Sequence, residues 1–442
     1  MPDHKAIDYP LLGRLYDLAT GDEDARVCKE IPDASCRHQP RNFFAYLIAN
    51  IFTKVADELC SARLIFPWLI GSLGAPAVFA GFLVPVREAG VLLPQLVIAA
   101  YIRRIAVRKW VWIAGGLLSA SAMAAVTLAV PSVRGTTAGW LIIALLSVYS
   151  LARGICSVSA KDVVGKTISK TRRGTLMGWS ASISGLLTLF IGIAIGLRNP
   201  DNTDGDFFVL LLASSAIAYV LSALCFAWIR EVPGATEGGG NALASALSSL
   251  GIVITDSHFR HFVIARTLLL SIALAPPFYV LLAQRSGVDL SGLGVLIIAS
   301  GLASMVSAPL WGRMSDRSSR RVMAVTALLS GLMGVTVFSL ELAGLYQFSG
   351  KWQITGLFFL IAVFHGGARL GRKTYLVDMA NQDNRATYVA VSNTLIGLFM
   401  LAGGAIGIVA DRFSVTTVIG LLGVISLLAA LYCWRIREVS GT

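Results

Sequence analysis

Long apolar stretches separated by short polar segments fill the chain from about residue 48 onward. A helix needs about 20 mostly apolar residues to cross the hydrocarbon core of a bilayer, which is roughly 30 Å thick. The pattern predicts twelve such helices, and an even number places both ends of the chain on the same side. The predicted spans are 48–72, 77–102, 110–130, 138–160, 175–198, 207–229, 261–284, 290–312, 322–343, 353–371, 386–410 and 415–435.

The composition agrees with a chain that lies in lipid. Of its 442 residues, 55% are hydrophobic and only 14% are charged, whereas a soluble protein has about 25% charged residues. The polar first forty residues do not have the pattern of a signal peptide. We therefore expect an all-α integral membrane protein whose main partner is the lipid bilayer, and an ordinary soluble enzyme is excluded.

The net charge of +12 is unevenly distributed over the predicted loops. Seventeen Lys and Arg residues fall on one side: Arg103, Arg104, Arg108, Lys109, Lys161, Lys166, Lys170, Arg172, Arg173, Arg313, Arg317, Arg320, Arg321, Arg369, Arg372, Lys373 and Arg385. Five fall on the other: Arg134, Arg198, Arg285, Lys351 and Arg412. Because cytoplasmic loops retain Lys and Arg, both termini are predicted to be cytoplasmic. The positive charge then reflects topology and argues against a nucleic-acid partner.

An offset of 212 residues aligns the two halves of the chain without gaps. Matched pairs include Phe66 with Phe278, Arg108 with Arg320, Trp140 with Trp352, Arg173 with Arg385 and Gly185 with Gly397. Parallel six-helix repeats are typical of secondary transporters that bind solute between the halves. The predicted organisation is a cytoplasmic tail (1–47), a six-helix bundle (48–230), a cytoplasmic linker (231–260), a second six-helix bundle (261–436) and a C-terminal tail (437–442).

The segment Gly312-Arg-Met-Ser-Asp316-Arg317-Ser-Ser-Arg320-Arg321 resembles the G-x-x-x-D-R-x-x-R-R loop of the major facilitator superfamily. With the repeat, the resemblance covers about residues 48–435, and segments such as TKVAD (53–57) resemble an uncharacterised bacterial branch. It implies the twelve-helix fold of that superfamily, in the bacterial inner (plasma) membrane. The first-half copy of the loop has Arg104 where the family has Asp, and helix 5 lacks the Gly-Pro pair of drug antiporters, which weakens a multidrug-efflux interpretation.

Several ionisable residues fall inside the predicted spans. Each costs about 2.5–3.5 kcal/mol on insertion scales, so such residues usually face the bundle interior and serve a function. The candidates for substrate binding and proton coupling are Lys54, Asp57, Glu58, Arg63, Arg87, Glu88, Arg153, Arg266 and His365. A competing interpretation is that Lys54, one helical turn from Asp57 and Glu58, forms a purely structural ion pair with them.

Five of these candidates are Lys or Arg and three are carboxylates. Surplus cations favour a small anionic or carboxylate-bearing solute. A carboxylate that changes its protonation state when the solute binds would couple transport to protons. The sequence thus predicts a monomeric secondary transporter that works by alternating access. The alternatives are a non-transporting assembly factor or sensor of the same fold, whose central charges would pair off without a cavity, and an integral-membrane enzyme. No catalytic, nucleotide-binding or metal-binding motif supports the enzyme, and no cofactor is expected.

The loop 312–321 is a candidate cytoplasmic gate formed by Gly312, Asp316, Arg317, Arg320 and Arg321. Asp316 can accept hydrogen bonds from the neighbouring arginines or cap a helix N-terminus. We expect this contact when the cytoplasmic side is closed and its loss when that side opens. The alternative is that the arginines only fix topology. Separately, the small-residue spacing of Gly178, Gly185, Gly192, Gly397, Gly404 and Gly407 predicts close helix packing.

Overall fold

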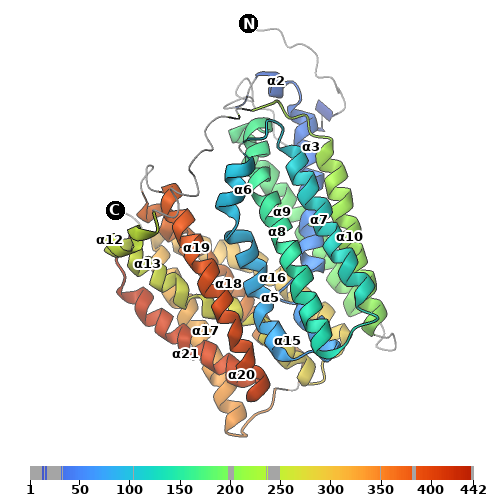
Figure 1. The fold of residues 1–442 in the computed structure, drawn as a ribbon. Coiled ribbons are helices and arrows are strands. Elements are labelled where there is room, and N and C mark those ends of the chain that lie inside the picture. Colours follow the sequence, from blue (N-terminus) through green and yellow to red (C-terminus); the bar gives the residue numbers. More distant parts are fainter. Residues whose placement is uncertain are drawn as a thin grey trace.

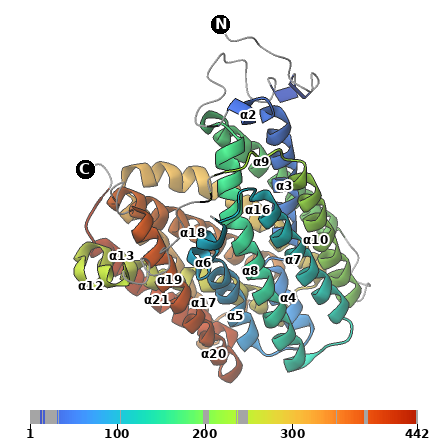
Figure 2. The ribbon, with the colours of Figure 1, turned by 45° about the horizontal axis from the view of Figure 1, so that its top comes forward.

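The computed structural model is built from helices, and the residues that it describes contain no strand. Those residues are 12–13, 15–16, 31, 33–102, 104–197, 204–234, 236, 249–348, 350–380 and 385–439. Figure 1 shows the helices of the first half, blue to green, beside those of the second half, yellow to red. The same two groups are visible in the turned view of Figure 2. We call them the N-terminal and C-terminal bundles.

Each bundle contains six crossings when consecutive short helices are joined. The N-terminal bundle consists of α3 (Gln39–Leu59), α4 (Ile65–Ser72), α5 (Ala77–Leu92), α6 (Gln95–Ile102), α7 (Lys109–Ala129), α8 (Gly135–Thr167), α9 (Lys170–Gly196) and α10 (Asp204–Ala227). The C-terminal bundle consists of α13 (Ser257–Leu268), α14 (Leu270–Leu274), α15 (Pro276–Arg285), α16 (Leu290–Arg317), α17 (Ser319–Leu342), α18 (Lys351–Met379), α19 (Arg385–Gly403), η2 (Gly404–Ile406), α20 (Gly407–Arg412) and α21 (Val415–Arg435). The short elements α2 (Asp33–Cys36), η1 (Ser249–Gly251) and α12 (Ile252–Thr255) lie outside them.

The predicted twelve-helix architecture is confirmed. Within the described ranges, 11 helices or joined helices are long and apolar enough to cross a membrane. The remaining crossing is α3 followed by α4, which is interrupted between Leu59 and Ile65 and carries the charged residues of the first predicted span. Its charges and its break reduce its apolar character, which is why hydropathy alone marks it weakly.

Several helices are longer than the apolar stretches that predicted them. α8 continues to Thr167, α16 to Arg317 and α18 to Met379, whereas the predicted spans end at 160, 312 and 371. The bundles begin at Gln39 and Ser257, before the predicted 48 and 261. Most of the predicted tail, and residues 237–248 of the predicted linker, lie outside the described residues. We call the end at which α8, α16 and α18 terminate the cation-rich end, and the other the opposite end.

Side-chain caps fix where helices of the C-terminal bundle begin. The Asp256 carboxylate accepts from the Phe259 amide at 3.1 Å, and the Asp289 carboxylate accepts from the Gly292 amide at 3.1 Å. Such caps satisfy amides that have no partner within the helix. Burial alone would raise the pKa of Asp256, but hydrogen bonds from the Tyr388 hydroxyl and the Phe259 amide hold it below its ordinary value.

The two bundles pack tightly at the opposite end, where glycines allow backbones to approach. A Cβ atom added to Gly294 of α16 would lie 2.3 Å from the Gly196 nitrogen of α9. A Cβ atom added to Gly407 would lie 2.7 Å from the Val78 Cα of α5. The prediction of close packing therefore holds for Gly192, Gly397, Gly404 and Gly407, but a Cβ on Gly178 or Gly185 would meet no atom within 4 Å.

A carboxylate from one bundle also caps a helix of the other. Asp411 of α20 accepts from the backbone nitrogens of Ala77 and Val78, at 2.6 and 2.9 Å, at the start of α5. Nearby, the Gln284 side-chain amide of α15 donates to the Trp68 carbonyl of α4 at 2.8 Å. Together with the glycine contacts, these bonds join the bundles at the opposite end.

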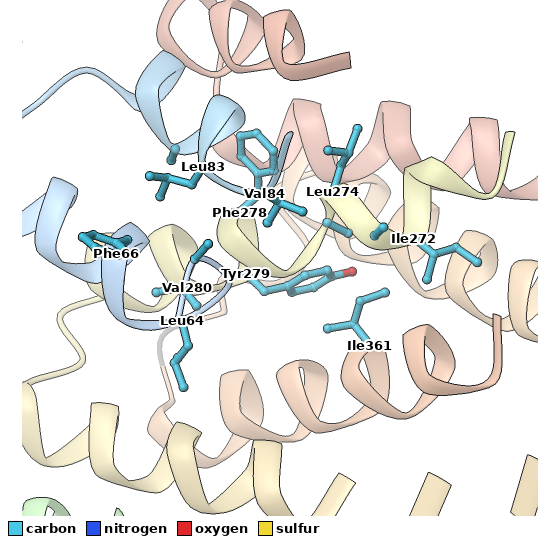
Figure 3. Close-up of a cluster of buried hydrophobic side chains, with 14 of the residues drawn as sticks. Leu64, Phe66, Leu83, Val84, Ile272, Leu274, Phe278, Tyr279, Val280 and Ile361 are labelled. Atoms are coloured by element: carbon cyan, nitrogen blue, oxygen red, sulfur yellow. The ribbon is translucent and has the colours of Figure 1, made fainter. Parts of the chain in front are cut away.

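A layer of apolar side chains lies inside this junction. Figure 3 shows Leu64, Phe66, Leu83 and Val84 of the N-terminal bundle close to Phe278, Tyr279 and Val280 of α15 and to Ile361 of α18. All of these side chains are buried. We call this set the apolar layer.

Candidate functional site

A network of charges and phenols is centred on Asp57 of α3. One carboxylate oxygen accepts from the Tyr149 hydroxyl at 2.6 Å and from the Tyr219 hydroxyl at 2.8 Å. The other accepts from Arg153 Nη2 at 2.8 Å, and Arg87 Nη2 lies 3.6 Å from the carboxylate. Helices α3, α5, α8 and α10 thus each contribute one or more members, which gives the network a role in holding the N-terminal bundle together.

Aromatic rings support both arginines of this network. The Arg87 guanidinium lies over the Tyr149 ring at 5.1 Å, and the Arg153 guanidinium lies over the Tyr219 ring at 5.5 Å. Cation–π contacts of this kind are favourable by about 0.5–2 kcal/mol, depending on solvation. The same two tyrosines therefore hydrogen-bond to the anion and stack on the cations, which orients all five side chains.

The break after α3 positions a second ion pair. Leu64 and Phe66 amides donate to the Ser61 carbonyl at 3.4 and 3.0 Å, which closes a turn between α3 and α4. From this turn Arg63 reaches Glu88 of α5, and its Nη2 lies 2.9 Å from Glu88 Oε1. A continuous first helix would place the side chain of Arg63 differently, so the break serves the site.

A cavity of about 690 Å³ lies between the bundles, and we call it the central cavity. The N-terminal bundle contributes Glu58, Ser61 and Arg63 to it. The C-terminal bundle contributes a polar wall from two helices: Ser300, Ser304, Ser307 and Gly312 of α16, with His365, Gly366, Arg369 and Lys373 of α18. Gly312 and Lys373 lie within the last two turns of their helices, so the cavity extends towards the cation-rich end.

The apolar layer separates this cavity from the opposite end. Leu64 and Pro276 line the base of the cavity, and Phe66 and Phe278, buried in the layer, follow them in the chain. A separate depression of about 590 Å³, lined by Trp68 and Leu281 among others, shares no lining residue with the central cavity. The path between the bundles is therefore interrupted by the apolar layer.

A smaller cavity of about 340 Å³ lies within the N-terminal bundle. Arg87, Glu88 and Arg153 line it together with Tyr46, Asn50, Thr53, Trp112 and Phe226. The Arg63–Glu88 ion pair connects it with the central cavity, because Arg63 lines one cavity and Glu88 lines the other.

The structure brings together most, but not all, of the candidates named from the sequence. Asp57, Arg87 and Arg153 form one network, and Arg63 and Glu88 form another. Glu58 and His365 line the central cavity.

Lys54 and Arg266 lie outside these groups. Lys54 lies in no ion pair within the described part of the chain, so the expected structural pair with Asp57 and Glu58 does not form. Asp57 is neutralised by arginines instead. Arg266 is buried and donates to Ser392 Oγ and, at 2.9 Å, to Asn393 Oδ1.

Residues of α18 and α16 that line the cavity were not among the candidates named from the sequence. Arg369, Arg372 and Lys373 were assigned to a loop, but they are helical, and Arg369 and Lys373 line the central cavity. The serines of α16 were also not among the candidates named from the sequence. Their spacing, at 300, 304 and 307, places them on one helix face, and that periodicity is a signal that could have found them.

Among the described residues, the candidate gate lacks the Asp316 contact that we expect for a closed cytoplasmic side, and the central cavity extends towards this end. Asp316 is exposed and lies in no ion pair among the described residues, and Ser318 rather than Asp316 caps α17 by accepting from the Arg321 amide at 3.1 Å. Arg320 Nε lies 3.2 Å from Glu438 Oε2 and also donates to the Ile436 carbonyl at 3.1 Å. Gly312 lines the cavity, and Arg317 is exposed. In this conformation the loop therefore holds the segment after α21.

Comparison with known proteins matches part of the sequence to a family and nearly all of the chain to a fold. The model of the Major Facilitator Superfamily matches residues 262–442. A multi-drug resistance efflux pump PmrA homolog of Lactococcus lactis is 28% identical over 172 residues, which is 36% of this chain and 39% of that protein. Sugar efflux transporter A of Dickeya chrysanthemi is 30% identical over 166 residues, 37% of this chain and 39% of that protein. The chain thus spans about two fifths of the length of these curated relatives.

Solved structures cover nearly all of the chain. A D-xylose-proton symporter aligns with a TM-score of 0.70 and 12% identity over 90% of this chain and 99% of that one. The nucleoside transporter NupG aligns with a TM-score of 0.65 and 11% identity over 89% of this chain and 98% of that one. Fold and site define an integral membrane protein made of two six-helix bundles around a central cavity. The C-terminal part of the chain, residues 262–442, is similar to the Major Facilitator Superfamily, and the chain shares its fold with the two transporters above. The matched proteins are transporters rather than enzymes, as expected from the sequence.

Proposed function

We propose that the protein is a secondary active transporter that moves a small anionic solute by alternating access. The observation that carries this proposal is the central cavity, which is lined by Arg63, Arg369 and Lys373, reaches towards one end and is separated from the other by the apolar layer. Under the positive-inside rule the cation-rich end is assigned to the cytoplasmic side. The proposal therefore includes an inward-facing state, with both termini in the cytoplasm and the protein in a bacterial inner membrane.

Proton coupling is assigned to Glu58. Asp57 is held by two tyrosines and two arginines, and Glu88 is held by Arg63. Glu58 lines the cavity, is exposed to it, and forms no ion pair with any described residue. It is therefore the carboxylate of the three that is most open to exchange of a proton with water and solute.

The non-transporting alternative predicts that the central charges pair off without a cavity. Asp57 and Glu88 are indeed paired with arginines, but a cavity of about 690 Å³ is present beside them. The observations therefore favour transport over a role as an assembly factor or sensor.

Labelling of one cavity residue from both sides of the membrane tests the proposal. In a variant without native cysteines, Ser304→Cys should react with a membrane-impermeant maleimide from the cation-rich side, and more slowly from the opposite side. Ser222→Cys is the inaccessible control, because Ser222 is buried against Thr53 at 2.7 Å. Ser132→Cys, exposed at the opposite end, is the control for sidedness.

Reaction of Ser304→Cys from the cation-rich side alone, at all times and temperatures tested, would contradict alternating access. It would favour a fixed cavity of the kind that a sensor uses.

A further inference from the structure

We propose that the central cavity binds a small anion with two or more negative charges, a dicarboxylate or a phosphate monoester, between the cations of α18 and the serines of α16. This inference rests on the proposed transport function and specifies its substrate class. It assigns solute binding to the C-terminal bundle, whereas the charges of the N-terminal bundle are largely paired with each other.

The first support is the distribution of unpaired charge. Asp57 is bound to two arginines and Glu88 to Arg63. By contrast, Arg369 and Lys373 line the central cavity and lie in no ion pair within the described ranges. The same holds for two further cations that do not line the cavity, Arg266 and Arg372, which interact electrostatically with each other. Glu58 is the carboxylate that lines the central cavity. Counted in and around the cavity, five cations (Arg63, Arg266, Arg369, Arg372 and Lys373) stand against two carboxylates (Glu58 and Glu88), a surplus of three positive charges. A monoanion would compensate only part of this surplus.

These cations are close enough to repel one another. Arg63, Arg369 and Arg372 interact electrostatically with one another and with His365. Arg266, which is 8% exposed, interacts unfavourably with Arg372 and, more weakly, favourably with Glu88. Its hydrogen-bond partners Ser392 and Asn393 are neutral, and its Nε atom is buried without a partner in the described structure. A buried cation that forms no ion pair is costly, and like charges close together repel one another. A bound multivalent anion would offset part of both costs.

The second support is the matching geometry of the two helices. His365, Arg369 and Lys373 are spaced at intervals of one helical turn on α18 and line one wall of the cavity. Ser300, Ser304 and Ser307 have nearly the same spacing on α16 and line the wall as well. Guanidinium groups form charge-assisted, often bidentate hydrogen bonds with carboxylates and phosphates, and hydroxyls can donate to the remaining oxygens.

The serine hydroxyls are available for this purpose. Ser304 Oγ donates to the Ser300 carbonyl at 3.1 Å, and Ser307 Oγ donates to the Val363 carbonyl at 3.4 Å. These bonds are long for hydroxyl donors, which prefer about 2.7–2.8 Å. A hydroxyl that rotates towards a bound oxyanion would therefore lose only a weak hydrogen bond.

Isothermal titration calorimetry of the full-length protein in lipid nanodiscs tests the inference with probes matched in size. Succinate is compared with butanoate, and glycerol 3-phosphate with glycerol. We expect at least one of the two dianions to bind at least tenfold more tightly than its partner of lower charge. Tighter binding of succinate would indicate a dicarboxylate substrate, and tighter binding of glycerol 3-phosphate would indicate a phosphate ester.

Variants locate the site. Arg369→Gln and Lys373→Gln should each weaken binding of the dianion at least tenfold, whereas Arg313→Gln, on an exposed position of α16 outside the cavity, should change it less than twofold. Arg87→Gln should also leave binding within about threefold, because Arg87 does not line the central cavity. Thermal melting of each variant checks that it is folded.

The inference is overturned if neither dianion binds, if butanoate or glycerol binds as tightly as its charged partner, or if binding depends on Arg87 and not on Arg369 and Lys373. Each of these results leaves the two-sided labelling of Ser304→Cys unaffected. Failure of the substrate class is therefore distinguishable from failure of the transport proposal.

Discussion

Asp57 is the residue through which four helices of the N-terminal bundle are connected. Its two oxygens accept from Tyr149, Tyr219 and Arg153, and Arg87 completes the set. A carboxylate with this many donors is held firmly, which suits a structural or positioning role within the bundle more than a role in releasing a proton.

We predict strong coupling between Asp57 and Arg153. The single substitutions Asp57→Asn and Arg153→Gln should each destabilise the protein by about 1–3 kcal/mol, because each leaves a polar or charged partner unsatisfied. The double variant should lose clearly less than the sum of the two. A double-mutant cycle on thermal or denaturant unfolding measures this, with the exposed Arg313→Gln as the near-neutral control. Simple additivity would show that the ion pair at 2.8 Å contributes nothing to stability.

The charged residues of the N-terminal network could be predicted because a charge inside an apolar stretch is conspicuous. Its two tyrosines, Tyr149 and Tyr219, were not predicted, because a phenol does not stand out in such a stretch. Asp57, Arg87 and Arg153 interrupt strongly apolar sequence, and their helices bring them close together. Arg369 and Lys373 could not be separated from loop cations in the same way. They lie at the end of the apolar part of their span, where a loop was expected. The structure shows that α18 continues through them and that both line the cavity.

Among the helices, α16 and α18, which line the cavity, extend past the apolar stretches that predicted them. The apolar length predicts where a span begins and ends in the membrane, but hydrogen bonding continues the helix for as long as neighbouring helices cover it. α16 and α18 pack against each other, and Trp311 of α16 donates to the Val363 carbonyl of α18 at 2.9 Å. Hydropathy therefore predicted the existence of each helix well and its polar end poorly.

Helix packing at the opposite end supplies a second prediction. Gly294→Ala should destabilise the protein by about 1–3 kcal/mol, because the added Cβ would lie 2.3 Å from the backbone nitrogen of Gly196. Gly185→Ala on α9, the helix that Gly294 contacts, is the matched control: its Cβ meets no atom within 4 Å, and the loss of chain entropy on folding is reduced. Unfolding midpoints compare the two. Equal effects would mean that the contact between α9 and α16 is not tight.

For the molecule as a whole, the two halves repeat in fold but differ in charge chemistry. The matched residues Arg108 and Arg320 each form an ion pair within their own half, with Asp162 and Glu438 respectively. Arg153 and His365, which the offset of 212 residues also aligns, differ in their contacts. Arg153 binds Asp57, whereas His365 lines the central cavity. This asymmetry agrees with our proposal that the C-terminal half binds the solute, whereas the N-terminal half contains the network around Asp57.

Alternating access requires that the same two bundles close one end as they open the other. Pulsed electron paramagnetic resonance in nanodiscs measures this with two pairs of spin labels. Each pair has one label on each bundle, at exposed positions: Thr171 with Arg313 at the cation-rich end, and Ser132 with Leu345 at the opposite end. Gly407→Val supplies the perturbation, because a side chain there would meet the backbone of α5 at 2.7 Å.

We predict that Gly407→Val lengthens the distance between Ser132 and Leu345 and, in the same molecules, shortens the distance between Thr171 and Arg313. Lengthening at the opposite end without shortening at the cation-rich end would show only local unpacking, and it would contradict alternating access.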